Sequence, residues 1–159
     1  MTKIIAHRGL INGPSAQLEN HPNTISTAIT KGFDAEIDLW YHNDGLWLGH
    51  DNPTYEIPLD FLYDHAKKLW IHAKTPETIV WLTEYTHDLN FFYHDRDLVT
   101  LTSRGIIWTY LGCEVAKSKS SVMVMPEMSH EGVMSREDIN CWYAICTDWA
   151  CDYREMLTI

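Results

Sequence analysis

Seven short apolar runs recur along the chain at intervals, and they limit the folds that it can adopt. Each run is rich in Ile, Val, Trp, Phe or Tyr, and each is bounded by polar residues or turn formers. Runs of this length and composition predict β-strands, at residues 3–7, 35–40, 69–74, 90–94, 105–110, 121–126 and 143–148.

The segments between the predicted strands have the character of helices. The clearest begins at Pro76, with Thr75 as the N-cap residue, because proline suits the first helical position and threonine caps it. The predicted helices span residues 24–31, 58–68, 76–87, 135–142 and 151–157. Strands that alternate with helices predict a parallel sheet covered by helices, either an open doubly wound sheet or a closed barrel.

A barrel is the preferred form of this α/β fold, because no glycine-rich nucleotide-binding sequence follows the first strand. A complete (β/α)8 barrel needs about 200 residues or more, whereas this chain has 159. We therefore expect a single domain, residues 1–159, that forms a minimal TIM-like (β/α) barrel of parallel strands. Its helices should be short or missing after the fourth and fifth strands, and residues 97–101 are candidates for a short eighth strand.

The charge of the chain excludes some partners. The formal net charge is −10, and no cluster of Lys or Arg stands beside aromatic residues, so nucleic acid is not an expected partner.

No apolar run reaches the length of a membrane span and no secretory signal is visible, so we expect a cytoplasmic protein. A thin barrel also leaves strand edges exposed, which keeps a homodimer open.

The second predicted strand contains two acidic residues in an apolar setting, Glu36 and Asp38. Side chains two positions apart share one face of a strand. Two carboxylates inside a barrel would repel each other and lose hydration unless a cation lay between them. Hard oxygen ligands suit Mg²⁺, Ca²⁺ or Mn²⁺, so the pair predicts one divalent metal ion. The alternative is an edge strand on which both carboxylates face solvent.

Two other strands bring charged or titratable residues to the same end of the barrel. The first strand finishes with His7 and Arg8, and the third finishes with His72 and Lys74. The carboxyl ends of barrel strands carry active sites. We therefore expect these four side chains to meet Glu36 and Asp38.

A predicted hairpin brings a second histidine to this end. Asn-Asp-Gly at residues 43–45 favours a tight turn, which would return His50 and Asp51 toward the end of the strand. Two histidines can then act as general acid and general base around a bound anion. The alternative is that His50 is a histidine of a polar loop.

An ordered set of short motifs resembles the glycerophosphodiester phosphodiesterase family of metal-dependent TIM-barrel enzymes. The motifs are IAHRG at the start of the chain, EN at 19–20, GFDAEID at 32–38, DG at 44–45 and GHD at 49–51. IHAK at 71–74 and ICTD at 145–148 resemble later strands of the family. The resemblance therefore spans nearly the whole chain.

The resemblance implies a role for each matching residue. His7 and His50 would be the catalytic acid and base, Arg8 and Lys74 would bind the substrate phosphate, and Glu36 and Asp38 would bind the metal. The family usually has Glu where this chain has His72. An imidazole ligand there would favour Mn²⁺ or Zn²⁺ over Ca²⁺, and the alternative is that water is the third ligand. Asp148 matches a residue for which a supporting role is expected. Further candidates for the surroundings of the site are Glu19, Asn20, Asp51, His94, Trp108 and Glu127.

The expected function is hydrolysis of glycerophosphodiesters, or of similar phosphodiesters of small alcohols, with a small-molecule substrate and one bound divalent ion. Two alternatives stay open. One is a phospholipase or lyase that acts on lysolipid head groups through the same centre. The other is a barrel that binds phosphorylated ligands without catalysis, which the replacement by His72 and the short chain suggest.

Overall fold

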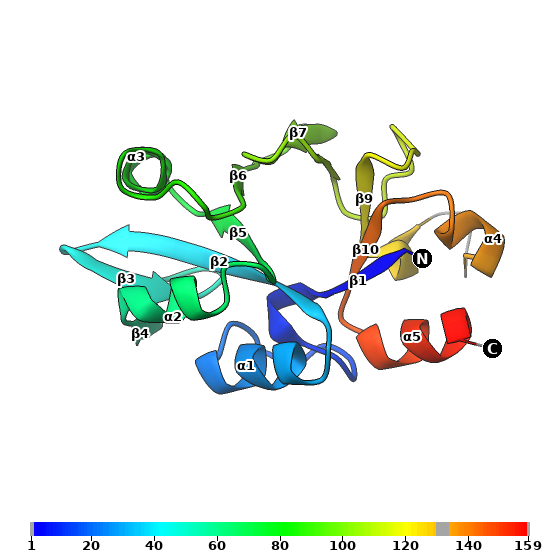
Figure 1. Ribbon diagram of the computed structural model, residues 1–159, viewed down its shortest axis with the longest axis horizontal. Coiled ribbons are helices and arrows are strands. Elements are labelled where there is room, and N and C mark those ends of the chain that lie inside the picture. Colours follow the sequence, from blue (N-terminus) through cyan, green and yellow to red (C-terminus); the bar gives the residue numbers. More distant parts are fainter. Residues whose placement is uncertain (1, 130–133, 159) are drawn as a thin grey trace.

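The computed structural model describes residues 2–129 and 134–158, and its strands form one sheet. Each of the seven predicted strands is present. Figure 1 shows the sheet curling, with β5, β6 and β7 on one side of the arc and β1, β9 and β10 on the other. The seven strands are β1 (Lys3–Ala6), β2 (Asp34–His42), β5 (Leu69–Ala73), β6 (Phe91–Tyr93), β8 (Ile107–Thr109), β9 (Ser121–Val124) and β10 (Ala144–Thr147).

These seven strands pair in parallel, as predicted. In spatial order they run β6, β5, β2, β1, β10, β9 and β8. Their carboxyl ends therefore meet at one rim. This arrangement places the ends of β1, β2 and β5 next to one another.

The expectation of an all-parallel barrel is wrong, because three further strands pair in antiparallel fashion. β3 (Gly45–Leu48) and β4 (Tyr55–Ile57) extend from β2 as the predicted hairpin and its continuation. The predicted eighth strand is β7 (Val99–Leu101), which is antiparallel to β8. Only a short turn joins these two strands, and parallel pairing would need a long crossover connection.

The curl is bridged between β6 and β7 by isolated hydrogen bonds rather than by a continuous ladder. The Ser103 N–H donates to the Phe91 carbonyl oxygen at 2.7 Å, and the Thr100 hydroxyl donates to the Tyr93 carbonyl oxygen at 3.0 Å. The fold is therefore α/β with a curled, mixed sheet. Its parallel strands neighbour one another in the order of a barrel, but no continuous ladder closes the sheet between β6 and β7.

Among the described residues, five α-helices pack on the outside of the sheet or at its ends. The start of α3 is as predicted, since the Thr75 hydroxyl accepts a hydrogen bond from the Thr78 N–H at 3.2 Å. Between β6 and β9 the described chain contains no helix, which confirms the predicted loss of helices there. No described helix has the length and apolar character needed to span a membrane. The helices are α1 (Pro22–Thr30), α2 (Leu59–Asp64), α3 (Pro76–Tyr85), α4 (Arg136–Ile139) and α5 (Ala150–Thr158).

The two faces of β2 lead to two different environments. Its odd-numbered residues Ile37 and Leu39 belong to an apolar cluster that also contains buried side chains of α1, α2 and α3. Glu36 and Asp38 point into the curl of the sheet, where Trp70, Phe92 and Trp108 form a second apolar cluster. The alternation that was read from the sequence therefore holds along this strand.

Candidate functional site

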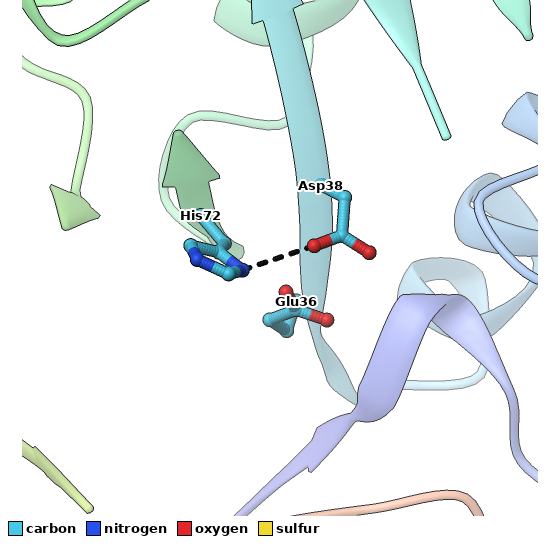
Figure 2. A group of neighbouring side chains, drawn as sticks. All are labelled: Glu36, Asp38 and His72. Atoms are coloured by element: carbon cyan, nitrogen blue, oxygen red, sulfur yellow. Dashed lines mark hydrogen bonds and ion pairs between the residues drawn. The ribbon is translucent and has the colours of Figure 1, made fainter. Parts of the chain in front are cut away.

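Glu36, Asp38 and His72 lie side by side on the neighbouring parallel strands β2 and β5 (Figure 2). The register of the two strands places Asp38 next to His72. One potential ligand atom from each residue lies within 4.8 Å of the others. Glu36 is 3% exposed and Asp38 is 1% exposed. This burial rules out the alternative in which the two carboxylates face solvent.

Asp38 is surrounded by donors. His72 Nδ1 lies 3.0 Å from Asp38 Oδ1, and Lys74 Nζ lies 3.1 Å from the same oxygen. Arg8 Nε lies 3.3 Å from Asp38 Oδ2. Burial alone would raise the pKa of Asp38, but the hydrogen bond from His72 and the charges of Lys74 and Arg8 hold that pKa well below its usual range. Asp38 is therefore an anion whose charge is compensated on several sides.

Asn20 fixes the position of Asp38 from behind. The Asn20 amide nitrogen donates to Asp38 Oδ2 at 2.8 Å, and the Asp38 backbone N–H donates to Asn20 Oδ1 at 2.9 Å. Asn20 is fully buried. The double contact orients the carboxylate, so Asn20 supports the site without lining its pocket.

Glu36 differs from Asp38 in its electrostatic environment. Its Oε2 accepts a hydrogen bond from the Arg8 backbone N–H at 3.0 Å. Burial raises the pKa of Glu36, and the neighbouring charge of Asp38 raises it further. The cationic groups nearby do not fully compensate the charge of an ionised Glu36. A bound cation at this point would do so.

His72 is oriented in the way that a metal-binding histidine requires. Its Nε2 lies 3.0 Å from the carbonyl oxygen of His94, and since a carbonyl can only accept, Nε2 carries the hydrogen. The contact with Asp38 needs a hydrogen on Nδ1 as well, and a bound ion would take the place of that hydrogen between Nδ1 and the two carboxylates. Metal-binding histidines commonly donate their second N–H to a backbone carbonyl in this manner. The donor set therefore fits one divalent ion.

His7 follows β1 in a tight turn that aims its ring at the pocket. Arg8 and Gly9 both have positive φ, 51° and 79°. A Cβ on Gly9 would lie 3.0 Å from the backbone of Ile25, so only glycine allows α1 to approach this turn.

The His7 ring is held by a carboxylate from the far end of the chain. His7 Nδ1 donates to Asp148 Oδ1 at 2.8 Å. Burial lowers the pKa of His7, but the hydrogen bond to Asp148 and the charge of Glu36 outweigh burial and raise it overall. Glu127 in turn accepts hydrogen bonds from the Thr147 hydroxyl at 2.9 Å and from the Asp148 N–H at 3.3 Å. Glu127 thus supports the segment that carries Asp148.

His50 is returned to the rim by the hairpin, as predicted. The Gly49 N–H donates to the Asp38 carbonyl oxygen at 3.2 Å. The Trp40 indole N–H donates to the Gly49 carbonyl oxygen at 2.6 Å. His50 Nδ1 lies 2.7 Å from Asp51 Oδ1. His50 lines the pocket rather than facing away in a loop.

Arg8 reaches the pocket with its guanidinium held between two acids. Its Nη1 donates to Glu19 Oε2 at 2.6 Å, in addition to the ion pair with Asp38. Glu19 therefore acts on the site through Arg8. The Glu-Asn pair at residues 19–20 positions one cation and one anion of the site.

All of the principal residues that were predicted from the sequence meet in one pocket with a volume of about 290 Å³. Among the further candidates, His94 and Trp108 also line it, whereas Glu19, Asn20, Asp51 and Glu127 contact lining residues or their neighbours. Trp108 is 4% exposed and stacks on Phe92 with ring centroids 4.4 Å apart, so it is both a packing residue and a wall. The pocket is lined by His7, Arg8, Glu36, Asp38, His50, His72, Lys74, His94, Asp95, Trp108, Thr109, Tyr110, Leu111 and Val124.

Five of these lining residues were not identified from the sequence: Asp95, Thr109, Tyr110, Leu111 and Val124. Each lies at or just beyond the carboxyl end of β6, β8 or β9. The rule that barrel sites gather at these ends could have identified them, although their residue types gave no signal of chemistry.

Comparisons with known proteins give one result, and it concerns the fold. No protein-family model matches the sequence, and no curated protein matches it at a significant level. A crystal structure from Galdieria sulphuraria, described as a "putative glycerophosphodiester phosphodiesterase", is similar with a TM-score of 0.53. The alignment covers 100% of this chain and 98% of that chain, at 11% sequence identity. The two proteins therefore share a fold, and the description of that protein names the family whose motifs this sequence resembles.

Proposed function

We propose that this protein is a metal-dependent phosphodiester hydrolase that cleaves glycerophosphodiesters or similar phosphodiesters of small alcohols. The observation that carries the proposal is the content of one pocket. Four histidines, an arginine, a lysine and a buried pair of carboxylates line it together. The shared fold and the motif resemblance support the same reaction class.

Arg8 and Lys74 bind the phosphate of the substrate. Both are cations at the pocket wall, and both are already directed inward by Asp38. Charge-assisted hydrogen bonds from guanidinium and ammonium groups to phosphate oxygens are strong. These two side chains would hold the substrate and stabilise negative charge that develops on it.

Glu36, Asp38 and His72 hold the divalent ion, Mg²⁺, Ca²⁺ or Mn²⁺. When bound, the ion supplies positive charge that polarises the phosphate. The protein's own contribution is to orient the ligands: Asn20 fixes Asp38, and the carbonyl of His94 fixes the tautomer of His72. An imidazole in the set favours Mn²⁺ over Ca²⁺.

His7 and His50 move the protons. In each ring Nδ1 is paired with a carboxylate, Asp148 or Asp51 respectively, so Nε2 is the nitrogen available to the substrate. The raised pKa of His7 favours its protonated form, which suits the acid that protonates the leaving oxygen. His50 then accepts the proton of the attacking hydroxyl group or water.

An assay of the purified chain tests this proposal. Glycerophosphocholine is incubated with the protein and Mg²⁺, Ca²⁺ or Mn²⁺, and released choline is measured before and after chelation. We expect hydrolysis that chelation abolishes and re-added ion restores. Absence of hydrolysis with every ion would contradict the proposal.

The same assay separates the alternatives. Tyr110 and Leu111 line the pocket and are 38% and 41% exposed, an apolar margin that could contact an acyl chain. Faster cleavage of a long-chain lysophosphatidylcholine would favour the lysolipid enzyme. Ion binding by calorimetry without hydrolysis of either compound would favour a binding protein.

A further inference from the structure

A second pocket lies at the amino ends of the parallel strands, at the opposite end of the sheet from the candidate functional site. Its volume is about 220 Å³. Among the described residues, three cationic side chains and one acid line it, although the whole chain has a formal net charge of −10. We call it the amino-end pocket, and its lining includes Lys3, Asp34, Lys67, Trp70, Asn90 and Arg104.

The acid of the amino-end pocket, Asp34, is already compensated. Its Oδ2 lies 3.1 Å from Lys3 Nζ and accepts a hydrogen bond from the Trp70 indole at 3.2 Å. Its Oδ1 lies 3.0 Å from Lys68 Nζ. Because an ammonium group has three N–H donors, Lys3 keeps donors for a second partner. Asp34 and its two lysines together therefore carry a net positive charge.

The other two cations of the pocket have no carboxylate partner among the described residues. Lys67 forms no ion pair there, and Arg104 donates through Nη2 to the backbone carbonyl oxygen of Asp88. Asp64 and Asp88 line the adjoining surface with these two cations, but neither carboxylate forms an ion pair with them. A guanidinium group has five N–H donors, so most of those on Arg104 stay available.

Asn90 adds a neutral donor to the same wall. It is 3% exposed and lines the pocket. Its side-chain oxygen is enclosed by the protein, and its side-chain NH₂ group donates to no described residue. The pocket therefore offers ammonium, guanidinium and amide donors together. Phosphate oxygens accept several hydrogen bonds at once, and those from cations are strong.

The three cations come from separate parts of the sheet. Lys3 belongs to β1, Lys67 precedes β5, and Arg104 lies in the turn between β7 and β8. β5 and β7 lie on opposite sides of the break between β6 and β7, where no continuous ladder joins the strands. An anion bound by all three cations would hold the β7–β8 turn against β1 and the segment before β5.

We propose that the amino-end pocket is a second anion site, for inorganic phosphate or the phosphate group of a small molecule, which links the two sides of the curled sheet. No residue lines both this pocket and the candidate functional site. Trp70 lines one and Trp108 lines the other, with ring centroids 5.9 Å apart, so packed side chains separate them. The site therefore does not depend on the proposed phosphodiesterase function.

Modification of individual lysines tests the proposal on the full chain. The protein is reductively methylated with a chelator present, in phosphate or in chloride at equal ionic strength, and mass spectrometry measures each lysine. We expect methylation of Lys67 to slow about threefold when phosphate is at roughly twice its dissociation constant. Lys31, which is exposed and outside both pockets, should react equally in both salts. Protection of Lys74 without Lys67 would confine phosphate to the candidate functional site and overturn the second site.

Substitutions assign the protection to the amino-end pocket. Arg104→Gln removes one charged donor from an exposed side chain, so it should weaken phosphate binding about tenfold, measured from the protection of Lys67 across a phosphate titration. Arg104→Lys keeps the charge and should retain part of the affinity. Lys31→Gln, the matched control, should leave the titration unchanged. Circular dichroism reports whether each variant folds, and wild-type protection of Lys67 in folded Arg104→Gln would overturn the proposal.

A comparison of two probes identifies the source of the phosphate group. Inorganic phosphate and sn-glycerol 3-phosphate are titrated with Lys67 methylation as the readout. Protection at similar concentrations supports a site for free phosphate, and protection at lower concentrations of the ester supports a site for an organic phosphate. Methylation of Lys67 at the chloride rate with both probes would overturn the site even in an active enzyme. Protection of Lys67 in a protein that hydrolyses no phosphodiester would leave the site and remove only the enzymatic function.

Discussion

The part of strand β2 that pairs in parallel, residues 34–39, buries Asp34 at its amino end and Asp38 near its carboxyl end, and the two aspartates have different neighbours. Asp34 is 3% exposed and Asp38 is 1% exposed. Asp34 lies 3.1 Å from Lys3 Nζ and 3.0 Å from Lys68 Nζ, and it accepts a hydrogen bond from the Trp70 indole at 3.2 Å. The side chains of those two lysines are 46% and 42% exposed.

The carboxyl end has a second buried acid and less exposed cations, and the amino end lacks both. Asp38 has a second buried acid beside it, Glu36, and its cationic partners Arg8 and Lys74 are only 20% and 14% exposed. Ion pairs between a buried acid and hydrated lysines hold a fold together, as at Asp34. An uncompensated second carboxylate beside imidazoles and inward-directed cations is the mark of a site. Burial of a charge alone does not distinguish the two ends.

The largest expected effect belongs to the histidines of the carboxyl end. Removal of either imidazole, by His7→Ala or His50→Ala, should lower turnover of a glycerophosphodiester by about 10²- to 10⁴-fold, the usual contribution of general acid–base catalysis. The fold should persist in both variants. Steady-state kinetics and circular dichroism measure the two properties.

A histidine outside the pocket is the control for this pair. His87 is exposed and lines none of the site, so His87→Ala should keep wild-type kinetics. Near-wild-type rates in either pocket variant would refute the assignment of that histidine, and a loss in His87→Ala would indicate a general effect on the protein.

The aspartates themselves give the next largest contrast. Asp38→Asn should weaken binding of Mn²⁺ by about 100-fold or more, because it removes the charge of a metal ligand. Asp34→Asn changes an equally buried carboxylate on the same strand and should leave ion affinity unchanged. Isothermal titration of both variants with Mn²⁺ measures the difference. Equal losses in the two variants would show that no ion is bound specifically at the carboxyl end.

Replacement of Glu36 should change the stability of the metal-free protein in a pH-dependent way. The raised pKa of Glu36 means that the native state holds this proton more tightly than the unfolded chain does. Stability therefore falls as pH rises from the unfolded value, about 4.3, through the raised native value. Glu36→Gln removes the buried charge, so it should raise the free energy of unfolding at pH 7 by roughly 1–3 kcal/mol.

Urea unfolding in the presence of a chelator, at pH 4 and pH 7, measures this effect. The gain in Glu36→Gln should be present at pH 7 and absent or reversed at pH 4, where the wild-type carboxyl group is protonated. A variant that is less stable than wild type at pH 7 would show that the Glu36 carboxylate is satisfied without an ion.

The sequence predicted the residues of the candidate site on β2 better than it predicted the pairing of the surrounding strands. The two-residue period placed Glu36 and Asp38 on one face, and the rule for carboxyl ends brought His7, Arg8 and Lys74 to them. Asp34 shares the same face, and only the structure shows that lysines neutralise it there. Partners that come from distant segments have no local signal.

The prediction of all-parallel pairing was wrong where a short connection determines how two strands pair. The segment at 97–101 has strand character, but the turn that follows it selects antiparallel pairing with β8, which a parallel barrel excludes. The unpaired nitrogens of His94 are likewise a property of the assembled pocket.

The smallest expected effect completes the comparison, because Asp34→Asn should cost stability and nothing else. Lys3 and Lys68 are nearly half exposed, so water solvates them when the carboxylate is lost, and the two partly exposed ion pairs contribute about 1 kcal/mol or less each. The Trp70 indole can still donate to the Asn oxygen. Urea unfolding should therefore show a loss of about 1 kcal/mol, with unchanged kinetics, since four residues of β2, about 13 Å, separate this end from the reacting groups. A loss of turnover at wild-type stability would mean that the amino end of β2 contributes to the site, and the division between a structural and a functional aspartate would fail.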